Sequence, residues 1–400
     1  MDAPPTLQRR RLGRTDLEVS ALGLGAMGII SHFHPDAASG IKVVHRAMDL
    51  GINCIDTAAS YFDSEQNLGK ALVGRWDRVV LLTKTAMRRG KRCQDEIDRS
   101  FERLGTDHIH VFQVHHVQYR EELDKVLGPG GAVELLQREK DRGRVGFIGI
   151  TSHHPRVLSE ALETGAFDTV QLPYNPIEAE TFRPIMQKAR ELDVGVLTMK
   201  PLAGGRLTSV EAALRFSAGD PSVACTLAGC TTLEHVETDV AALAAGAAPI
   251  KERERAALAQ EIEQLGDLFC RRCRYCEKEC PAEIPISDIF RCHDYLVLNQ
   301  TYAREEYHKL GKHQGRCLEC GGCEKICPYH LPVRDMLDVA HDELNQGRWI
   351  DLVSRVLQRT GGYDLVRGAY FKLLGAKMLP QFRYLHRNDL KGKKRKRRSQ

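Results

Sequence analysis

Two cysteine blocks with the same spacing are the residues of this chain best suited to chemistry. Each block reads C-x2-C-x2-C-x3-C-P, and together they hold eight of the thirteen cysteines: Cys270, Cys273, Cys276 and Cys280 in the first, and Cys317, Cys320, Cys323 and Cys327 in the second. A chain wraps a [4Fe–4S] cube with this spacing, and the fourth cysteine of each block usually binds the other cluster. The sequence therefore predicts two [4Fe–4S] clusters, which are one-electron cofactors.

Disulfides and zinc are the two alternatives for these cysteines. Disulfides require an oxidising compartment, and the N-terminal residues show no secretion signal with an apolar core. Zinc takes four ligands per ion, so the third and fourth cysteines of each block are superfluous for it. The proline after each fourth cysteine is also typical of ferredoxins, which favours the clusters.

The length of the chain indicates more than a ferredoxin. With 400 residues, two or more domains are expected. No apolar run reaches the length of a membrane helix, so we expect no transmembrane segment. The stretch Leu12–Ser20 after Arg9–Arg11 is mixed and charged, unlike the apolar core of a twin-arginine signal. The expected location is the cytoplasm.

The net charge of +5 arises at the C-terminal end of the sequence. Residues 391–398 (KGKKRKRR) carry seven positive charges and no negative one. Such a charge run predicts a disordered, solubilising tail at 387–400. A tether to polyanions such as nucleic acid or anionic lipid, and a patch that steers an acidic electron carrier, stay open as alternatives. No specific nucleic-acid partner is predicted.

Short apolar, β-branched segments alternate with helix-like stretches over the first 250 residues. Eight are predicted as strands: 21–25, 53–58, 79–84, 109–115, 147–152, 170–175, 195–201 and 224–231. Eight strands alternating with helices over about 250 residues is typical of a (β/α)8 TIM barrel. Gly23, Gly25 and Gly28 formally fit the G-x-G-x-x-G fingerprint of a doubly wound sheet. No ribose-binding acid follows at the expected distance, so the barrel is favoured.

An ordered series of segments resembles the aldo-keto reductase family. These are LGRTDLEVSALGLGAMG (12–28), GINCIDTAASYFDSEQNLGKAL (51–72), VVLLTK (79–84), DHIHVFQVHH (107–116), VGFIGITS (145–152) and VQLPYNP (170–176). The resemblance covers about residues 7 to 245 and implies a (β/α)8 barrel that reduces carbonyls with a nicotinamide cofactor. The whole chain resembles a branch of that family with a C-terminal two-cluster ferredoxin domain.

The resemblance places the family's catalytic tetrad on Asp56, Tyr61, Lys84 and His115, each at or just beyond the end of a predicted strand. Carbonyl reduction adds a hydride to carbon and a proton to oxygen, and Tyr61 is the expected proton donor. A phenol with a pKa of about 10 is a poor acid at neutral pH. The Lys84 ammonium is expected to lower that pKa, while Asp56 keeps Lys84 charged and oriented. His115 is expected to donate to the substrate oxygen.

The resemblance also implies residues for the nicotinamide end of the cofactor. The carboxamide is expected near Thr151, Ser152 and Gln171. Met199 stands where many relatives have a ring-stacking tyrosine, and a thioether can also pack on a ring. Lys200 adds a cation where many relatives have serine, which suits a pyrophosphate.

The adenosine end departs from the family pattern. The segment from Gly229 to His235 contains no lysine or arginine to pair with the 2′-phosphate of NADP, and it carries Glu234. Asp239 stands at a position commonly held by asparagine. Gly229 and Asp239 are expected at the cofactor, which is NADP or NAD, with the choice between them open.

The last third of the chain is predicted to be mainly α-helical. The two cysteine blocks are 36 residues apart, and the insert at 286–310 has helical spacing of apolar residues. This favours an α-helical ferredoxin-like domain. The expected organisation is a barrel at 1–250, a linking helix at 251–269, a ferredoxin-like domain at 270–340, a helical extension at 341–386 and the tail at 387–400.

The expected protein is an NAD(P)H-dependent oxidoreductase that acts on a small-molecule carbonyl or alcohol and carries two clusters for electron transfer. Two alternatives stay open because nicotinamide passes a hydride whereas each cluster passes one electron. In one, an external electron carrier feeds the clusters, which deliver electrons to a substrate in the barrel. In the other, the barrel is catalytically silent and the protein is an electron-transfer adaptor. The intact tetrad argues against the adaptor, and the sequence names no substrate.

Overall fold

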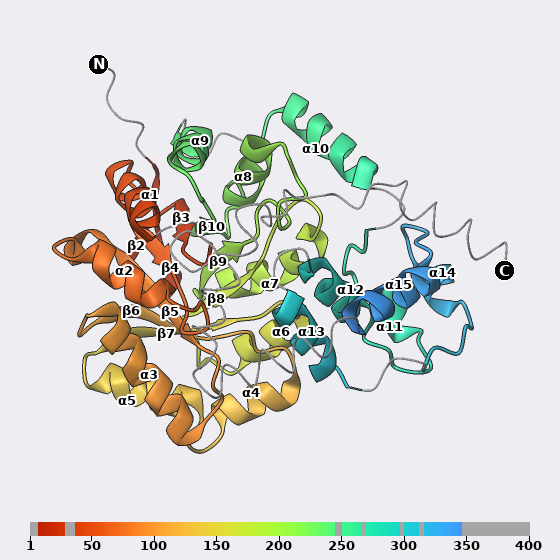
Figure 1. The fold of residues 1–400 in the computed structure, drawn as a ribbon, viewed down its shortest axis with the longest axis horizontal. Helices are drawn as coiled ribbons and strands as arrows, with labels where there is room; N and C mark the ends of the chain where they lie inside the picture. The colour runs from red at the N-terminus through yellow and green to blue at the C-terminus, as the bar shows by residue number, and fades with distance from the viewer. Residues whose placement is uncertain are drawn as a thin grey trace, which may run out of the picture. The chain divides into compact units, whose positions relative to one another are not determined.

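The chain divides into two units, Met1–Gly266 and Asp267–Gln400 (Figure 1). The computed structural model describes residues 7–28, 37–244, 250–265, 269–296, 300–311 and 316–345. The expected helical extension beyond residue 345 and the basic tail at 387–400 lie outside the described residues. The first unit holds every strand that the structure describes, whereas every described element of the second is a helix.

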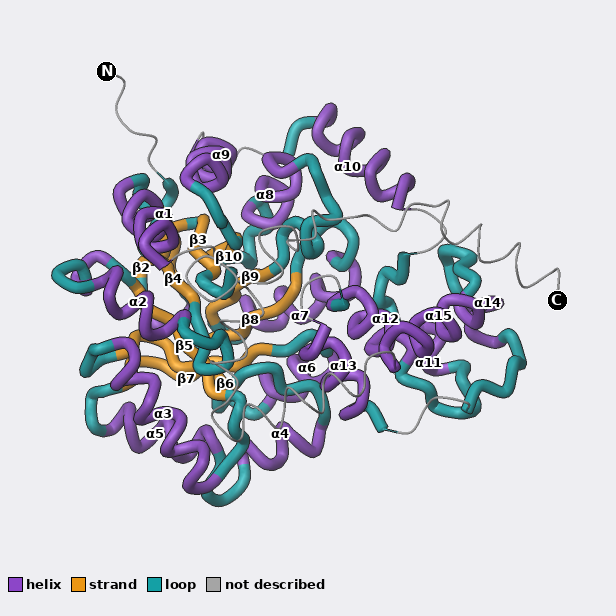
Figure 2. Tube along the Cα trace, viewed as in Figure 1, coloured by secondary structure: helices purple, strands orange, loops and turns teal. Residues whose placement is uncertain are grey.

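A closed barrel of eight parallel strands forms the centre of the first unit (Figure 2). The strands are β3 (Leu22–Gly25), β4 (Cys54–Asp56), β5 (Val80–Thr85), β6 (Ile109–Val114), β7 (Val145–Thr151), β8 (Thr169–Pro173), β9 (Gly195–Met199) and β10 (Cys225–Ala228). Pairing of β10 with β3 closes the barrel. The predicted (β/α)8 barrel is confirmed, since each predicted segment overlaps one barrel strand. Several predicted strands extend up to three residues beyond the observed ones, as 224–231 does beyond Cys225–Ala228.

Helices surround the barrel because each presents one apolar stripe to it. They are α1 (Ala37–Asp49), α2 (Ser64–Leu72), α3 (Gly90–Leu104), α4 (Arg120–Leu127), α5 (Ala132–Asp141), α6 (Pro155–Glu163), α7 (Ala179–Glu191), α8 (Val210–Ala218) and α9 (Leu233–Ala244). In α3 the buried residues Cys93, Ile97, Phe101 and Leu104 recur every three or four positions. Gly105 then ends this helix in the left-handed conformation, with its N–H bonded to the Phe101 carbonyl.

The packing inside the barrel explains the first glycine of the fingerprint-like run. A side-chain carbon on Gly23 would stand 2.6 Å from Cys225 Sγ and 2.7 Å from a Leu227 methyl group. Only glycine fits there, because the neighbouring strand already fills the space. Gly23 therefore serves the barrel core, and the doubly wound alternative is wrong.

A two-stranded hairpin, absent from the sequence predictions, closes the N-terminal end of the barrel. It consists of β1 (Arg9–Arg11) and β2 (Glu18–Ser20), which pair antiparallel. Leu12 and Val19 are fully buried in the apolar cluster that fills the barrel interior. The hairpin thus plugs the end opposite to that where barrel enzymes keep their chemistry.

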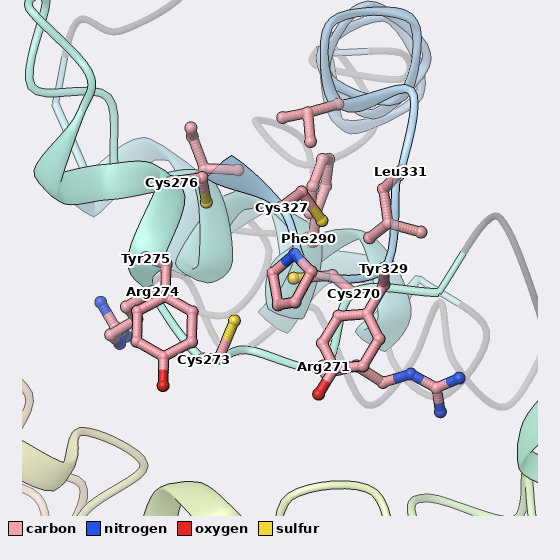
Figure 3. A pocket seen from close by; sticks show the side chains of 13 residues that line it. Cys270, Arg271, Cys273, Arg274, Tyr275, Cys276, Phe290, Cys327, Tyr329 and Leu331 are labelled. Carbon is pink, nitrogen blue, oxygen red and sulfur yellow. The ribbon is translucent and has the colours of Figure 1, made fainter. Parts of the chain in front are cut away.

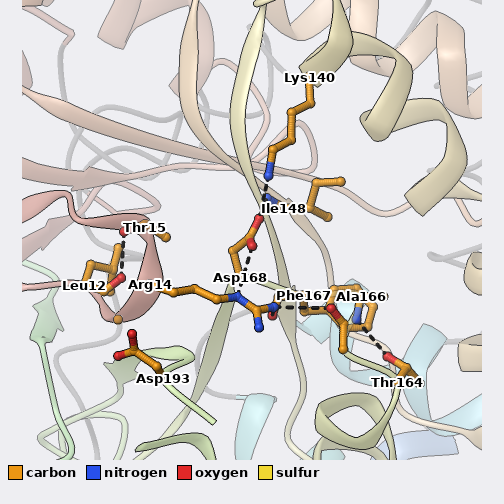
Figure 4. Close-up of polar contacts among 12 residues, drawn as sticks. Leu12, Arg14, Thr15, Lys140, Ile148, Thr164, Ala166, Phe167, Asp168 and Asp193 are labelled. Atoms are coloured by element: carbon orange, nitrogen blue, oxygen red, sulfur yellow. Dashed lines mark hydrogen bonds and ion pairs between the residues drawn. The ribbon is translucent and has the colours of Figure 1, made fainter.

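Arg14 anchors this hairpin through the contacts shown in Figure 4. Its Nη2 donates to the Phe167 carbonyl at 2.7 Å, and its Nε donates to Asp168 at 3.3 Å. Asp168 also accepts a hydrogen bond from Lys140 Nζ at 3.1 Å and another from Ile148 N at 3.0 Å. One carboxylate therefore joins the hairpin to α5 and β7.

Helix α10 (Glu252–Leu265), expected within the linking segment 251–269, belongs to the barrel unit. Glu254 forms an ion pair with Arg215 of α8. Glu261 accepts hydrogen bonds from Thr208 N at 2.9 Å and Thr208 Oγ1 at 2.7 Å. These contacts fix the helix to the segment that leads into α8.

The second unit consists of short helices around a small apolar core. They are α11 (Tyr275–Lys278), α12 (Ile286–Tyr295), α13 (Gln300–Lys309), α14 (Gly322–Ile326) and α15 (Val333–Asn345). The core joins Ile289 and Phe290 of α12 to Leu337 and Leu344 of α15, together with several block cysteines. The prediction of a mainly helical ferredoxin-like domain is confirmed for the described residues. Within these same residues, no helix of either unit has the length and apolarity needed to cross a bilayer.

The stability of the barrel should depend on a histidine that must stay neutral. His110 of β6 accepts a hydrogen bond from Leu81 N at 3.2 Å, and burial, assisted by His108, lowers its pKa to about 4. The unfolded chain binds that proton near pH 6.5, so the contribution is present above this pH and is lost as the pH falls toward 4. The free energy of unfolding of the wild type should fall between pH 7 and pH 5. In His110→Gln we expect this fall to be smaller by roughly 1 kcal/mol. Urea unfolding at both pH values measures this, and equal losses in wild type and variant would contradict it.

Candidate functional site

The four residues of the expected tetrad lie together at the C-terminal end of the barrel. Asp56 ends β4 and Lys84 lies near the end of β5. His115 directly follows β6, and Tyr61 lies in the loop between β4 and α2. Parallel strands in a barrel bring their ends to one face, so residues far apart in the sequence meet there.

A buried ion pair forms the centre of this group. Lys84 Nζ donates to Asp56 Oδ2 at 2.6 Å and to the Thr57 carbonyl at 2.8 Å. The Lys84 and Asp56 side chains are 1% and 5% exposed. Lys84 Nζ also lies 5.0 Å from the centre of the Tyr61 ring. Burial alone would lower the pKa of Lys84, but Asp56 and Tyr61 raise it above its ordinary value, so the ammonium stays charged.

Two glutamine amides hold the Asp56 carboxylate from two other strands of the barrel. Gln113 Nε2 of β6 donates to Asp56 Oδ1 at 3.2 Å and to Gln171 Oε1 at 2.9 Å. Gln171 Nε2 of β8 lies 3.5 Å from Asp56 Oδ2. Burial raises the pKa of Asp56, and Lys84 and the two amides oppose that rise. Donors from three strands thus fix the carboxylate in place.

His115 stands edge-on to Tyr61. The two ring centres are 5.6 Å apart and the ring planes are 83° apart. The Ser60 hydroxyl lies 3.2 Å from His115 Nδ1. Burial lowers the pKa of His115 well below its ordinary value, and the charges of Lys84 and Arg88 act in the same direction. At neutral pH the imidazole is therefore uncharged and has one N–H to donate.

Three residues of this site were missing from the sequence predictions: Gln113, Ser60 and Arg88. Gln113 carried a usable signal, because it is a polar residue within the buried, apolar strand β6. Ser60 lies in a loop and carried none. Arg88 follows β5, but its contacts are with the carbonyls of residues 115 and 116, which no local pattern reveals.

The residues expected at the nicotinamide carboxamide have partners within the protein. Thr151 Oγ1 accepts a hydrogen bond from His116 N at 2.8 Å. Ser152 Oγ accepts one from His154 N at 2.9 Å. Gln171 binds the same carboxylate as Lys84, so it adjoins the tetrad, whereas Ser152 is directed to the loop that leads into α6.

Other expected cofactor residues follow the last two strands of the barrel. Met199 ends β9, and Lys200 follows it in the left-handed conformation with a φ of 58°. Gly229 follows β10 and lies against Gly25, where an added side-chain carbon would stand 3.9 Å from Gly229 N. Bare backbone thus faces bare backbone where β3 ends and β10 is followed by Gly229.

Asp239 lies on α9 beside the loop that follows β10. Its Oδ2 accepts a hydrogen bond from Cys230 Sγ at 3.2 Å. Burial raises the pKa of Asp239 to about 6, although Cys230 and His235 oppose the rise. At pH 7 the group is mostly ionised, so a negative charge lies beside Cys230.

The eight block cysteines line two separate pockets of the second unit. The first is lined by Cys270, Cys273, Cys276 and Cys327, and Figure 3 shows their sulfurs around one space. The second is lined by Cys280, Cys317, Cys320 and Cys323. Each pocket therefore takes three cysteines from one block and the fourth from the other. This is the exchange expected when two cubes are bound.

The block cysteines surround a space in each pocket, which suits a cube. Within the described parts of the chain, no three or more His, Cys, Asp or Glu side chains are grouped so that they could hold one metal ion. A cube binds each thiolate at a separate corner, so its ligands surround a space. Backbone amides also point at the sulfurs, since Arg272 N lies 3.4 Å from Cys270 Sγ and Ile284 N lies 3.5 Å from Cys280 Sγ. Such donors stabilise a negatively charged cluster.

Comparison with protein families matches both units. Residues 21–214 match the aldo/keto reductase family, and residues 269–331 match the 4Fe-4S dicluster domain. The first match spans the barrel from β3 into α8, which includes the whole tetrad. The second match spans both cysteine blocks.

Individual proteins agree with these matches. The aldo-keto reductase YhdN of Bacillus subtilis is 30% identical over 48% of this chain, which covers 62% of YhdN, less than two thirds of its length. The L-galactose dehydrogenase of Arabidopsis thaliana is 28% identical over 59% of this chain and 88% of its own. A putative aldo-keto reductase of Pseudomonas aeruginosa, PA4992, is similar in structure with a TM-score of 0.54 and 30% identity, covering 59% of this chain and 95% of its own. The chain therefore belongs to the aldo/keto reductase family of oxidoreductases and carries a 4Fe-4S dicluster domain.

The exchange of cysteines between the blocks predicts which cysteine substitutions remove the same cluster. We expect Cys273→Ser and Cys327→Ser each to remove the cluster of the first pocket, so that combining them removes no further iron. Combining Cys273→Ser with Cys320→Ser should remove both clusters, because these residues line different pockets. Iron and acid-labile sulfide per anaerobically purified chain, with EPR of the reduced protein, measure this. Equal iron contents in the two double variants would contradict the exchange.

Proposed function

We propose that the barrel unit is an NAD(P)H-dependent carbonyl reductase with Tyr61 as proton donor, and that the second unit holds two [4Fe–4S] clusters. The observation that supports it best is the Lys84 ammonium, which pairs with Asp56 at 2.6 Å and lies 5.0 Å from the Tyr61 ring. The substrate is a small-molecule carbonyl, or the alcohol in the reverse direction.

Tyr61 gives its proton to the substrate oxygen as negative charge develops there. The phenolate left behind is stabilised by the Lys84 ammonium, which makes Tyr61 a better proton donor. Asp56 keeps Lys84 protonated inside the barrel, where an isolated ammonium would lose its proton. The half-buried position of Tyr61 leaves its hydroxyl within reach of a substrate.

His115 acts as a neutral donor to the same substrate oxygen. A Ser60 hydroxyl that donates to Nδ1 leaves the ring proton on Nε2, the nitrogen away from Ser60. A neutral imidazole donates without first losing a charge, which suits an oxygen that gains negative charge in the transition state. Tyr61 and His115 thus approach one oxygen from two sides.

The cofactor would lie across the C-terminal ends of the strands. When bound, the nicotinamide supplies the hydride to the carbonyl carbon. The residues that would hold it are Thr151, Ser152 and Gln171 at the carboxamide, Met199 at the ring, Lys200 and Gly229 at the pyrophosphate, and Asp239 at the adenosine. The facing glycines, Gly25 at the end of β3 and Gly229 just after β10, support the pyrophosphate position. NADP and NAD are both candidates.

A second candidate function uses the clusters as the working electron path to the barrel, with an external electron carrier as partner. The observation that favours it is the completeness of both cysteine pockets, because every block cysteine lines one of them. We place either enzyme in the cytoplasm, where reducing conditions keep cysteines as thiols. The two functions differ in whether reduction of the substrate needs intact clusters.

Substitution of Tyr61 tests the first function. We expect Tyr61→Phe to lower kcat for reduction of model aldehydes by about 10²- to 10⁴-fold, because the proton donor is lost. Cys273→Ser should retain activity, since that cysteine lines a pocket of the other unit. The measurement is anaerobic oxidation of NADPH or NADH, with circular dichroism to confirm folding. Loss of activity in both folded variants would favour the second function instead.

The charge of Asp239 tests the adenosine position. Because its pKa is raised to about 6, its charge is present at pH 7.5 and largely lost at pH 5.5. Protonation removes repulsion toward the 2′-phosphate, so NADPH should bind relatively more tightly at the lower pH. We expect Asp239→Asn to reduce the pH dependence of NADPH affinity by about two- to fivefold, because the two charges are partly screened by solvent. Fluorescence titration measures it with NADH as the control, and identical pH dependence of NADPH binding in both proteins would contradict this placement.

A further inference from the structure

We propose that Arg88 is a positioning residue that holds the turn at His115 and His116, and so directs the His115 imidazole toward the reacting oxygen. The inference rests on the proposed function, because that function gives His115 its task. It adds a residue outside the tetrad, supplied by the loop that follows β5.

The turn at His115 and His116 needs external support. His116 has a φ of 55°, a left-handed conformation that is uncommon for a residue with a Cβ. Because the chain leaves β6 through this residue, the direction of the His115 side chain depends on whether the turn is held. A neighbouring residue that fixes both carbonyls of the turn would therefore also fix the imidazole.

Neighbouring strands bind the N–H groups of this turn. His115 N donates to the Thr85 carbonyl at 2.9 Å. His116 N donates to Thr151 Oγ1 at 2.8 Å. Val117 N donates to the Thr151 carbonyl at 2.9 Å. These bonds attach the turn to β5 and β7, and they leave the carbonyls of residues 115 and 116 to be bound from another side.

Arg88 binds both carbonyls with one guanidinium. Its Nη1 donates to the His115 carbonyl at 2.7 Å, and its Nη2 donates to the His116 carbonyl at 2.9 Å. The Arg88 side chain is only 18% exposed, so these bonds are largely shielded from water. Two parallel donors on a planar group fix direction as well as distance, which a lysine ammonium cannot do.

Glu122 of α4 holds the guanidinium in place. Its Oε1 lies 3.0 Å from Arg88 Nη2, and its Oε2 accepts a hydrogen bond from Gln118 N at 2.7 Å. The carboxylate therefore bridges Arg88 and the segment just after the turn. The Arg88 guanidinium thus lies between the turn and the start of α4, and it is bound to both.

The charge of Arg88 also favours His115 as a donor, in addition to the hydrogen bonds that hold the turn. The charged and titratable groups around His115 are Lys84, Arg88, Tyr61 and His116. Burial and the two cations lower the pKa of His115, which keeps the ring neutral and able to donate. Geometry and charge can be separated, because a lysine at position 88 retains the charge but loses the paired donors.

The experiment compares Arg88→Met and Arg88→Lys with a matched control, Arg103→Met. Arg103 lies on α3 and pairs with the buried Glu65 of α2 at 3.2 Å, so its loss also removes the cation from an ion pair of the same barrel. Two measurements are made on each folded protein. One is kcat with KM for the aldehyde and NAD(P)H, and the other is the ¹⁵N NMR spectrum of the histidine rings, with His115 assigned from His115→Asn.

We expect both Arg88 variants to lower kcat by about 10- to 100-fold with little change in KM for NAD(P)H, since a misdirected donor weakens transition-state stabilisation rather than cofactor binding. The His115 ring signals should shift in both variants and stay unchanged in Arg103→Met. Arg88→Lys should keep a lower His115 pKa than Arg88→Met, and it also serves if the methionine variant fails to fold.

Unchanged kcat and unchanged His115 signals in the Arg88 variants would overturn the proposal. So would an equal loss of kcat in Arg103→Met, which would show an effect of stability alone. If the wild-type protein reduces no carbonyl, the proposed function fails, but the His115 signals still decide whether Arg88 orients that ring.

Discussion

A charged lysine held inside the barrel is the interaction on which the rest of the site depends. Removing one partner of a buried ion pair typically costs about 3–5 kcal/mol, because the other charge is left without compensation. Lys84 is therefore tolerable only while Asp56, at 2.6 Å, and the Thr57 carbonyl are in place. Asp56 in turn is held by the amides of Gln113 and Gln171. Closing the barrel brings these strands to one face and so assembles the charge that Tyr61 requires.

The second unit obeys a different constraint, because its fold is built around its own cysteines. Cys276, Cys323 and Cys327 belong to the same buried core as Ile289 and Phe290 of α12. Since each pocket draws its fourth cysteine from the other block, neither block can complete a pocket alone. Formation of the pockets and packing of the helices are therefore expected to be coupled, as for other metal centres whose ligands come from separate segments.

The sequence was sufficient to predict those parts of the fold and the site that depend on a local or repeated pattern. The alternation of apolar strands and helices predicted the barrel, and C-x2-C-x2-C-x3-C-P predicted the cysteine pockets. It was insufficient where contacts join distant segments. The hairpin that buries Leu12 in the barrel interior depends on a fit against Gly195, which neither segment reveals by itself. Arg88 is a similar case, since an arginine in a loop shows no preference for the carbonyls that it binds. Gln113 could have been found, because a buried strand rarely carries an amide without a partner.

The central claim is that the tetrad supports direct hydride transfer from nicotinamide to a carbonyl carbon. Anaerobic reduction of a model aldehyde with NADPH or NADH deuterated at C4, followed by mass spectrometry of the alcohol, tests it most directly. We expect one deuterium on the product carbon, with cofactor labelled on the transferred face, whether or not the clusters are reduced. Product formed without deuterium, with the cluster spectrum bleached during turnover, would contradict it, because the electrons would then have reached the substrate through the second unit.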